Sequence, residues 1–368
     1  MKKLIYYLSL PLVFAACSQV QEDTDNIIEY QAVTAKSQPT KVEGTVYPTD
    51  LPFVSFAFNY DAKSVWTDVK DESDAASTYI DAAEIIYDED GDNIYLPGTW
   101  HSSKIYFWPK TDKLAFFSYS PSALKNGVTC TPQNGIQVTD YDVDSNPDVD
   151  FMVADVQADL EKQTVNNPVT TLFRHKLCQV YFSIISYKDN EPFDYAGGHT
   201  EENLTDKDYL ITLKKIEIRN IYNKATYKGT NDPAVQANAG SWTPSGDKKT
   251  YTIFDSSMQV NDDFQMIVPT IPNKYFMPQD LDNDAELVIS YTVKHGETVT
   301  PLTPSFQLNQ LGNGNALISK WDMNKIYTYN LRIDLGSNVI TWAPEIVDWE
   351  DVDAGIVHID VPNGGLAN

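Results

Sequence analysis

Short runs in which apolar and polar residues alternate recur along almost the whole chain. The clearest runs are residues 54–58, 114–119, 180–184, 213–221, 287–293 and 327–335. A period of two places successive side chains on opposite faces, which is typical of half-buried antiparallel strands. Asn-Gly, Asp-Gly and Ser-Gly pairs fall between the runs and supply turns. The sequence therefore predicts an all-β protein built from sandwiches of many short strands.

Helical patterns are sparse. Residues 75–86 and part of residues 155–163 are the two segments in which we expect a short helix, and neither carries a long apolar stripe. A polar stretch over residues 161–167 ends in Pro168 and is the best internal boundary. The sequence thus predicts one folded domain before this stretch and a larger one after it.

The first seventeen residues have the pattern of an export signal. Lys2 and Lys3 precede an apolar stretch over residues 4–14, which is too short for a membrane span. Two alanines then lead to Cys17, and this order resembles the lipobox of bacterial lipoproteins, which implies a lipid on Cys17. An ordinary signal peptide with a cysteine near its cleavage site is the alternative. Residues 18–29 are polar and acidic and are interpreted as a disordered tether.

The charge of the chain excludes some partners. Its 52 acidic and 27 basic residues give a formal net charge of −25. Nucleic acid and anionic lipid surfaces both require basic footprints, so neither is an expected partner. Beyond Cys17 only Cys130 and Cys178 remain. They either pair in an oxidising compartment or are both buried strand residues, and their spacing fits no metal site.

Eight segments, in order along the chain, resemble motifs of the fimbrillin family of Bacteroidales, of the Mfa-like and FimA-like kind. They are SKIYFWP (103–109), KLAFFSYSP (113–121), DFMVA (150–154), LFRHKLCQV (172–180), IYNKATY (221–227), MIVP (266–269), WDMNKIYTY (321–329) and IVDW (346–349). Asn324 stands where the family motif has glycine. Because the segments keep the family order over nearly the whole mature chain, the resemblance applies to both expected domains.

The resemblance implies two transthyretin-like antiparallel β-sandwich domains in tandem, over residues 30–165 and 166–368. It also implies a fimbrial (pilus) structural subunit, exported as a lipoprotein to the outer membrane and the cell surface, whose partners are other fimbrial subunits. We expect no enzymatic activity, no catalytic residue and no cofactor. The alternative is a lipid-anchored tip or anchor protein, an adhesin that binds a glycan or a host protein without polymerising.

The family assembles by strand exchange, in which a protease removes the first strand and a neighbouring subunit donates a replacement. Lys36 and Lys41 are the predicted cleavage sites. The predicted removable strand contains Ile27, Ile28, Tyr30, Ala32 and Val33. The predicted donor strand contains Val357, Ile359 and Val361, and the same segment would equally serve as the last strand of the second sandwich.

One feature departs from the polymerising members of the family. No arginine precedes Arg174, so an arginine-specific protease has no site near the tether. Either an enzyme that accepts lysine matures the chain, or the first strand stays in place. A retained strand would block the groove and would make the protein an anchor, a terminal unit or a monomeric surface lipoprotein.

Other candidate ligand sites are weaker. Asp140, Asp142 and Asp144 belong to a loop with Asp or Asn at every second position. Such oxygen ligands suit calcium, but a solvated acidic loop is the favoured interpretation. Trp66, Trp100 and Trp242 would stack on sugars if they were exposed, and we expect them in the core instead. His175 lies within a family strand motif and is expected to be a core or edge residue.

Overall fold

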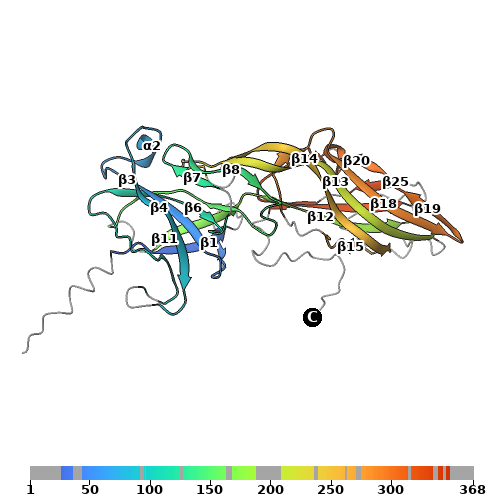
Figure 1. The fold of residues 1–368 in the computed structure, drawn as a ribbon, viewed down its shortest axis with the longest axis horizontal. Helices are drawn as coiled ribbons and strands as arrows, with labels where there is room; N and C mark the ends of the chain where they lie inside the picture. Colours follow the sequence, from blue (N-terminus) through green and yellow to red (C-terminus); the bar gives the residue numbers. More distant parts are fainter. Residues whose placement is uncertain are drawn as a thin grey trace, which may run out of the picture.

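The computed structural model describes residues 26–35, 44–91, 95, 97–124, 127–162, 168–187, 209–235, 239–261, 263–270, 275–313, 316–334, 339–342 and 345–348. Strands dominate this part of the chain, which confirms the all-β prediction. Its helices are single turns, α2 (Trp66–Val69) and the 3₁₀ helix η2 (Leu308–Gln310). No helix in these ranges is both long enough and apolar enough to cross a membrane. Figure 1 shows an elongated molecule with sheets at both ends.

The first sheet has nine strands and closes on itself. Its order is β10-β6-β3-β4-β5-β1-β11-β9, β2 pairs with β1, and β9 pairs back with β6. With β10 and β2 set aside, the remaining seven strands form a ring, at the left of Figure 1. The strands are β1 (Tyr30–Ala35), β2 (Gly44–Val46), β3 (Phe53–Tyr60), β4 (Ser77–Asp88), β5 (Thr99–Ser102), β6 (Lys113–Ser120), β9 (Met152–Ala154), β10 (Gln157–Leu160) and β11 (Val169–His175).

Two further sheets contain most of the remaining strands. One contains β7 (Val128–Thr131), β8 (Gly135–Asp142), β13 (Tyr209–Lys228), β14 (Ser241–Val260), β18 (Glu286–His295), β19 (Thr298–Leu302) and β20 (Ser305–Gln307). The other contains β12 (Cys178–Tyr187), β15 (Gln265–Met266), β16 (Tyr275–Phe276), β24 (Lys325–Asp334), β25 (Val339–Trp342) and β26 (Glu345–Asp348). Two small pairs complete the set, β17 (Gln279–Asp280) with β23 (Lys320–Trp321), and β21 (Gly312–Asn313) with β22 (Ala316–Leu317).

Three large hydrophobic clusters hold these sheets together. One fills the ring, a second lies between β12, β24 and the sheet of β13, and a third joins the two ends of the molecule. The strand β3 serves two of them, because Phe53 and Ala57 face the ring interior while Phe56 and Phe58 face the joining cluster. A strand buried on both faces reads as a nearly continuous apolar run, as residues 53–58 do.

Strand pairing crosses the predicted boundary at residue 165. The strand β11 lies after that boundary but belongs to the first sheet, and β8 lies before it but pairs with β13. The joining cluster likewise mixes residues from both sides, such as Phe117 and Tyr227. The sheets do not separate at residue 165. The division into domains of residues 30–165 and 166–368 therefore stays a prediction.

Both helical expectations are wrong. Residues 77–88 of the first segment form β4, and residues 157–160 of the second form β10. Each strand carries one residue with positive φ, Ala82 at 47° and Asp159 at 58°. The pairing of β4 with β3 also shifts register near Ala57. An extra residue at such a bulge interrupts the alternation of apolar and polar residues. The sequence of these segments therefore did not indicate strands.

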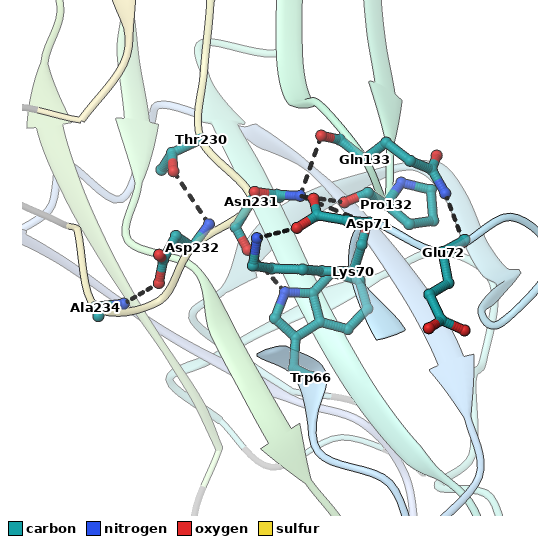
Figure 2. Close-up of polar contacts among 10 residues, drawn as sticks. All are labelled: Trp66, Lys70, Asp71, Glu72, Pro132, Gln133, Thr230, Asn231, Asp232 and Ala234. Atoms are coloured by element: carbon teal, nitrogen blue, oxygen red, sulfur yellow. Dashed lines mark hydrogen bonds and ion pairs between the residues drawn. The ribbon is translucent and has the colours of Figure 1, made fainter. Parts of the chain in front are cut away.

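A polar clasp, centred on Asn231, connects α2 to the β7–β8 hairpin (Figure 2). The Asn231 side-chain nitrogen donates to Asp71 Oδ1 at 2.9 Å, Gln133 O at 3.0 Å and Pro132 O at 3.1 Å. Its backbone carbonyl accepts from Trp66 Nε1 at 2.7 Å. Trp66 itself is fully buried in the joining cluster. The clasp thus ties the connection between β3 and β4 to the sheet of β13.

Candidate functional site

The first described strand, β1, is a link in the closed ring. It runs parallel to β11, in register from Tyr30 opposite Val169 to Thr34 opposite Phe173. The amide of Val169 donates to the carbonyl of Glu29 at 2.8 Å, which extends this pairing by one residue. Because β11 pairs with β9 on its other side, β11 becomes an edge strand if β1 leaves.

The opposite edge of β1 is held by several short segments. Tyr30 pairs with Trp100 of β5, and residues 33–35 pair with residues 44–46 of β2. Before the strand, backbone hydrogen bonds of 2.8 Å join Ile28 to Tyr106 and Asn26 to Trp108. The strand β1 therefore lies between β11 on one side and three separate segments on the other, namely β2, β5 and residues 106–108.

Alternate side chains of β1 and the residues before it enter the ring. Ile28, Tyr30, Ala32 and Thr34 are all buried, and the first three belong to the ring cluster. Gln31 on the outer face is exposed, and Thr170, its partner on β11, is exposed as well. The period of two in the sequence thus places an apolar face inward at this strand.

Tyr30 is the largest side chain that β1 contributes. Its ring meets Phe53 and Phe116 edge to face, with ring centroids 5.8 and 6.0 Å away and interplanar angles of 81° and 88°. Burial is the main cause that raises the pKa of its phenol well above the ordinary value. Among the described residues the hydroxyl, which lies near Ser55, has no hydrogen-bond partner of ordinary geometry. Aromatic packing therefore holds Tyr30 in place.

Most residues of the predicted removable strand are buried, and their removal stays a prediction. Ile27, Ile28, Tyr30 and Ala32 are buried, and Ile27 forms an isolated bridge with Phe107. Val33 is only half-buried. Sequence reasoning missed Thr34, which is 1% exposed, because a threonine at the end of an apolar alternation resembles a solvent-facing residue. Thr34 lies at every second position with Tyr30 and Ala32, and this spacing could have indicated that its side chain faces inward.

Three basic residues at the end of β11 and directly after it are buried. Arg174 donates from Nε and Nη2 to both carboxylate oxygens of Asp155, at 2.8 and 3.0 Å. His175 Nδ1 lies 2.8 Å from Asp150 Oδ2, as expected for a core histidine. Lys176 donates to the carbonyl of Ala239 at 3.1 Å. Because the described residues place Arg174 in the core, the first arginine of the chain is not accessible to a protease.

The other predicted strand-exchange residues lie outside the described part of the chain. They are Cys17, Lys36, Lys41, Val357, Ile359 and Val361. Lipidation, cleavage and strand donation at these positions remain predictions.

The acidic loop is bound by cationic and amide groups of the protein. Asp142 accepts from Asn223 at 2.8 Å. Asp144 accepts from Lys249 at 2.6 Å and from Tyr251 at 2.9 Å. Asp140, which lies near the end of β8, has a φ of 52°. Within the ranges described, no group of three or more His, Cys, Asp or Glu side chains is arranged to hold a metal ion, and the calcium alternative stays a prediction.

The aromatic and cysteine residues divide between the core and half-buried positions. Trp66 and Trp100 are buried and Trp242 is half-buried, which excludes the first two from stacking on sugars. Cys130 and Cys178 are free thiols, Cys178 buried and Cys130 half-buried. Burial raises the pKa of both thiols well above the ordinary value, so neither has the character of a reactive thiolate.

Comparison with known proteins agrees with this architecture. The model of the fimbrillin-like family matches residues 56–349. A crystallised fimbrial protein of Bacteroides vulgatus is similar, with a TM-score of 0.56 and 18% identity over 88% of this chain and 99% of that chain. Two proteins assigned to cell adhesion, from Bacteroides uniformis and Bacteroides ovatus, are 13% and 14% identical over 88% of this chain and 98% and 97% of theirs, with TM-scores of 0.42 and 0.41. Among curated proteins nothing matches.

Proposed function

The chain belongs to the fimbrillin-like family, and from that premise we propose that it is a fimbrial subunit joined to its neighbours by donor-strand exchange at the position of β1. It is anchored in the outer membrane through lipid on Cys17 and acts on the cell surface. Its partners are other fimbrial subunits, and it needs neither a cofactor nor catalysis. The observation that carries the proposal is the place of β1, the first described strand, in a ring of strands that would open without it.

The energetics of the ring support exchange in preference to an empty groove. Loss of β1 leaves the backbone groups of β11 that faced it unpaired, and each of these groups that stays buried costs about 1–3 kcal/mol. It also removes Tyr30 from the ring cluster, and an aromatic side chain lost from a core costs about 3–5 kcal/mol. A replacement strand recovers both terms, as in other cases of β-strand addition.

The test is cleavage of the intact mature chain with trypsin at Lys36 and Lys41, followed by gel analysis for oligomers that resist heat and detergent. We expect a ladder of oligomers from the cleaved protein. The variant K36Q/K41Q should give no ladder, because the first strand stays covalently attached. A strictly monomeric cleaved protein contradicts the proposal.

A disulfide provides a matched control for strand release. Gln31 and Thr170 are exposed register partners on adjacent strands, which are about 4.8 Å apart in a sheet. This spacing lies within the range of about 4.4–6.8 Å that a disulfide spans. The variant Q31C/T170C should therefore form no ladder after cleavage while oxidised, and should form one after reduction. A ladder under oxidising conditions would show that β1 need not leave.

A second candidate function, an adhesin that keeps its first strand, has one feature in its favour. A cleft of about 530 Å³ is lined by residues that include Tyr222, Trp242 and Asp322. Aromatic and carboxylate groups together suit a glycan or a peptide. An adhesin would remain monomeric after trypsin treatment, and the alanine variant of Trp242 would lose ligand binding. The same ladder assay thus separates the two functions.

A further inference from the structure

The strand now in the groove shows which side chain each position inside the ring holds. Four inward positions follow at every second residue, and their occupants are Ile28, Tyr30, Ala32 and Thr34. We name them the aliphatic, aromatic, small and hydroxyl subsites. In the order of the chain, the groove therefore holds an aliphatic, an aromatic, a small and a hydroxyl side chain.

The aromatic subsite is shaped for a six-membered ring. Phe53 and Phe116 both pack edge to face against the Tyr30 ring, and aromatic pairs prefer this geometry. A branched aliphatic side chain would leave part of this space empty. Such a cavity adds to the free energy that is lost because less apolar surface is buried. Phenylalanine should fit as well as tyrosine, because the hydroxyl of Tyr30 finds no hydrogen-bond partner of ordinary geometry among the described residues.

The small subsite excludes larger side chains. Ala32 is buried in the ring cluster, opposite Thr171 of β11. Protein interiors are packed too densely to admit additional methylene groups without strain. A donor strand must therefore combine a ring at one inward position with a small side chain at the next.

The candidate donor segment of this chain lacks that combination. Residues 350–368 contain no Phe, Tyr or Trp, so no register and neither direction places such a ring in the aromatic subsite. If Ile359 occupies that subsite, Val361 or Val357 enters the small subsite, depending on the direction of the strand. In this register the segment is too small at the aromatic subsite and too large at the small subsite.

On the basis of the proposed function, we infer that the groove of β1 accepts a strand from a different chain, with an aliphatic, an aromatic, a small and a hydroxyl residue at alternate positions. A second copy of this chain is not the donor.

Peptide exchange into the cleaved protein tests this inference. Full mature chain cut at Lys36 and Lys41 is warmed with labelled peptides, and the label retained after gel filtration is measured. The peptides are residues 26–35, the same peptide with Tyr30→Phe, Tyr30→Ala or Gln31→Ala, and residues 354–363 with and without I359F/V361A. Gln31→Ala is the matched control, since that side chain faces outward.

Residues 26–35 and the Tyr30→Phe and Gln31→Ala peptides should enter the groove equally well. The Tyr30→Ala peptide and residues 354–363 should enter about tenfold less or worse, which corresponds to about 1.4 kcal/mol. The change I359F/V361A should restore most of the loss. Equal entry of residues 354–363 and residues 26–35 overturns the inference and leaves the proposed function standing. If not even residues 26–35 enter, the proposed function fails, and the inference fails with it.

Discussion

The buried pair of Arg174 and Asp155 is the residue-scale interaction whose loss should cost most. Both side chains are buried, and the two hydrogen bonds at 2.8 and 3.0 Å make the contact bidentate. The change Asp155→Ala leaves a buried guanidinium without its carboxylate and should lower the free energy of unfolding by about 3–5 kcal/mol. Urea unfolding measures the effect.

An exposed ion pair provides the control for that prediction. Lys320 and Asp322 lie 2.8 Å apart, but their side chains are 56% and 46% exposed. The change Asp322→Ala should alter the free energy of unfolding by no more than about 1 kcal/mol. Equal effects of the two alanine changes would contradict the assignment of Asp155 to a buried, structural ion pair.

Asn231 yields a second prediction at this scale, because its side-chain nitrogen faces oxygen atoms only among its described partners. Asp71, Pro132 and Gln133 each offer it an acceptor. The change Asn231→Ala should lower stability by about 1–3 kcal/mol. The isosteric change Asn231→Asp should cost more, since a carboxylate would then face the same oxygens. A thermal midpoint for Asn231→Asp above that of Asn231→Ala would refute this reading of the clasp in Figure 2.

At the scale of single elements, prediction succeeded where alternation was regular. The run at residues 327–335 lies almost wholly in β24, and the run at residues 213–221 lies in β13. It failed at β4, where Ala82 inserts a residue with positive φ into the strand. Successive small and acidic residues on either side of Ala82 then resemble a helix surface. A bulge is set by the pairing with β3, which a single segment does not reveal.

The bulge in β4 gives a prediction of its own. An L-residue in the left-handed region costs about 1–2 kcal/mol, and glycine avoids this cost at some loss of chain entropy. The exposed residue Ala82 should therefore tolerate Ala82→Gly with a gain in stability of up to about 1 kcal/mol. The change Ala83→Gly, at a neighbouring residue without positive φ, should be destabilising. Equal losses in urea unfolding at both positions would contradict the strained backbone.

For the whole molecule, the tyrosines make stability depend on alkaline pH. Burial raises the pKa of Tyr181 to about 12, and it raises the pKa of Tyr47, Tyr141, Tyr227 and Tyr329 further. A neutral phenol is thus favoured in the folded state, while unfolded tyrosine ionises near pH 10. The resulting stability is complete below about pH 10 and is lost as pH rises through the folded-state pKa values.

Thermal unfolding between pH 9 and pH 12, with tyrosinate absorbance recorded in parallel, tests this prediction. We expect the midpoint to fall steeply above about pH 10 and the buried tyrosines to ionise together with loss of structure. Reversible ionisation of all tyrosines near pH 10 with the near-ultraviolet signal intact would contradict it.

The arrangement of the sheets in the whole molecule was beyond sequence reasoning. The family resemblance could be found from local motifs, and the buried face of β1 could be found from the alternation of Tyr30 and Ala32. The parallel pairing of β1 with β11 joins residues about 140 positions apart, since Tyr30 lies opposite Val169. Such a contact depends on the packing of all three clusters, and no local pattern encodes it.

Amide hydrogen exchange at β11 tests the central claim most directly. In the precursor, the amide of Val169 is bonded to Glu29, so it should exchange slowly. Cleaved protein from which residues 26–35 have been removed should exchange rapidly at this amide, and heat-resistant oligomers free of that peptide should be protected again. If the amide stays protected in the cleaved monomer, or if the oligomers still contain residues 26–35, no donor strand has replaced β1 and the claim fails.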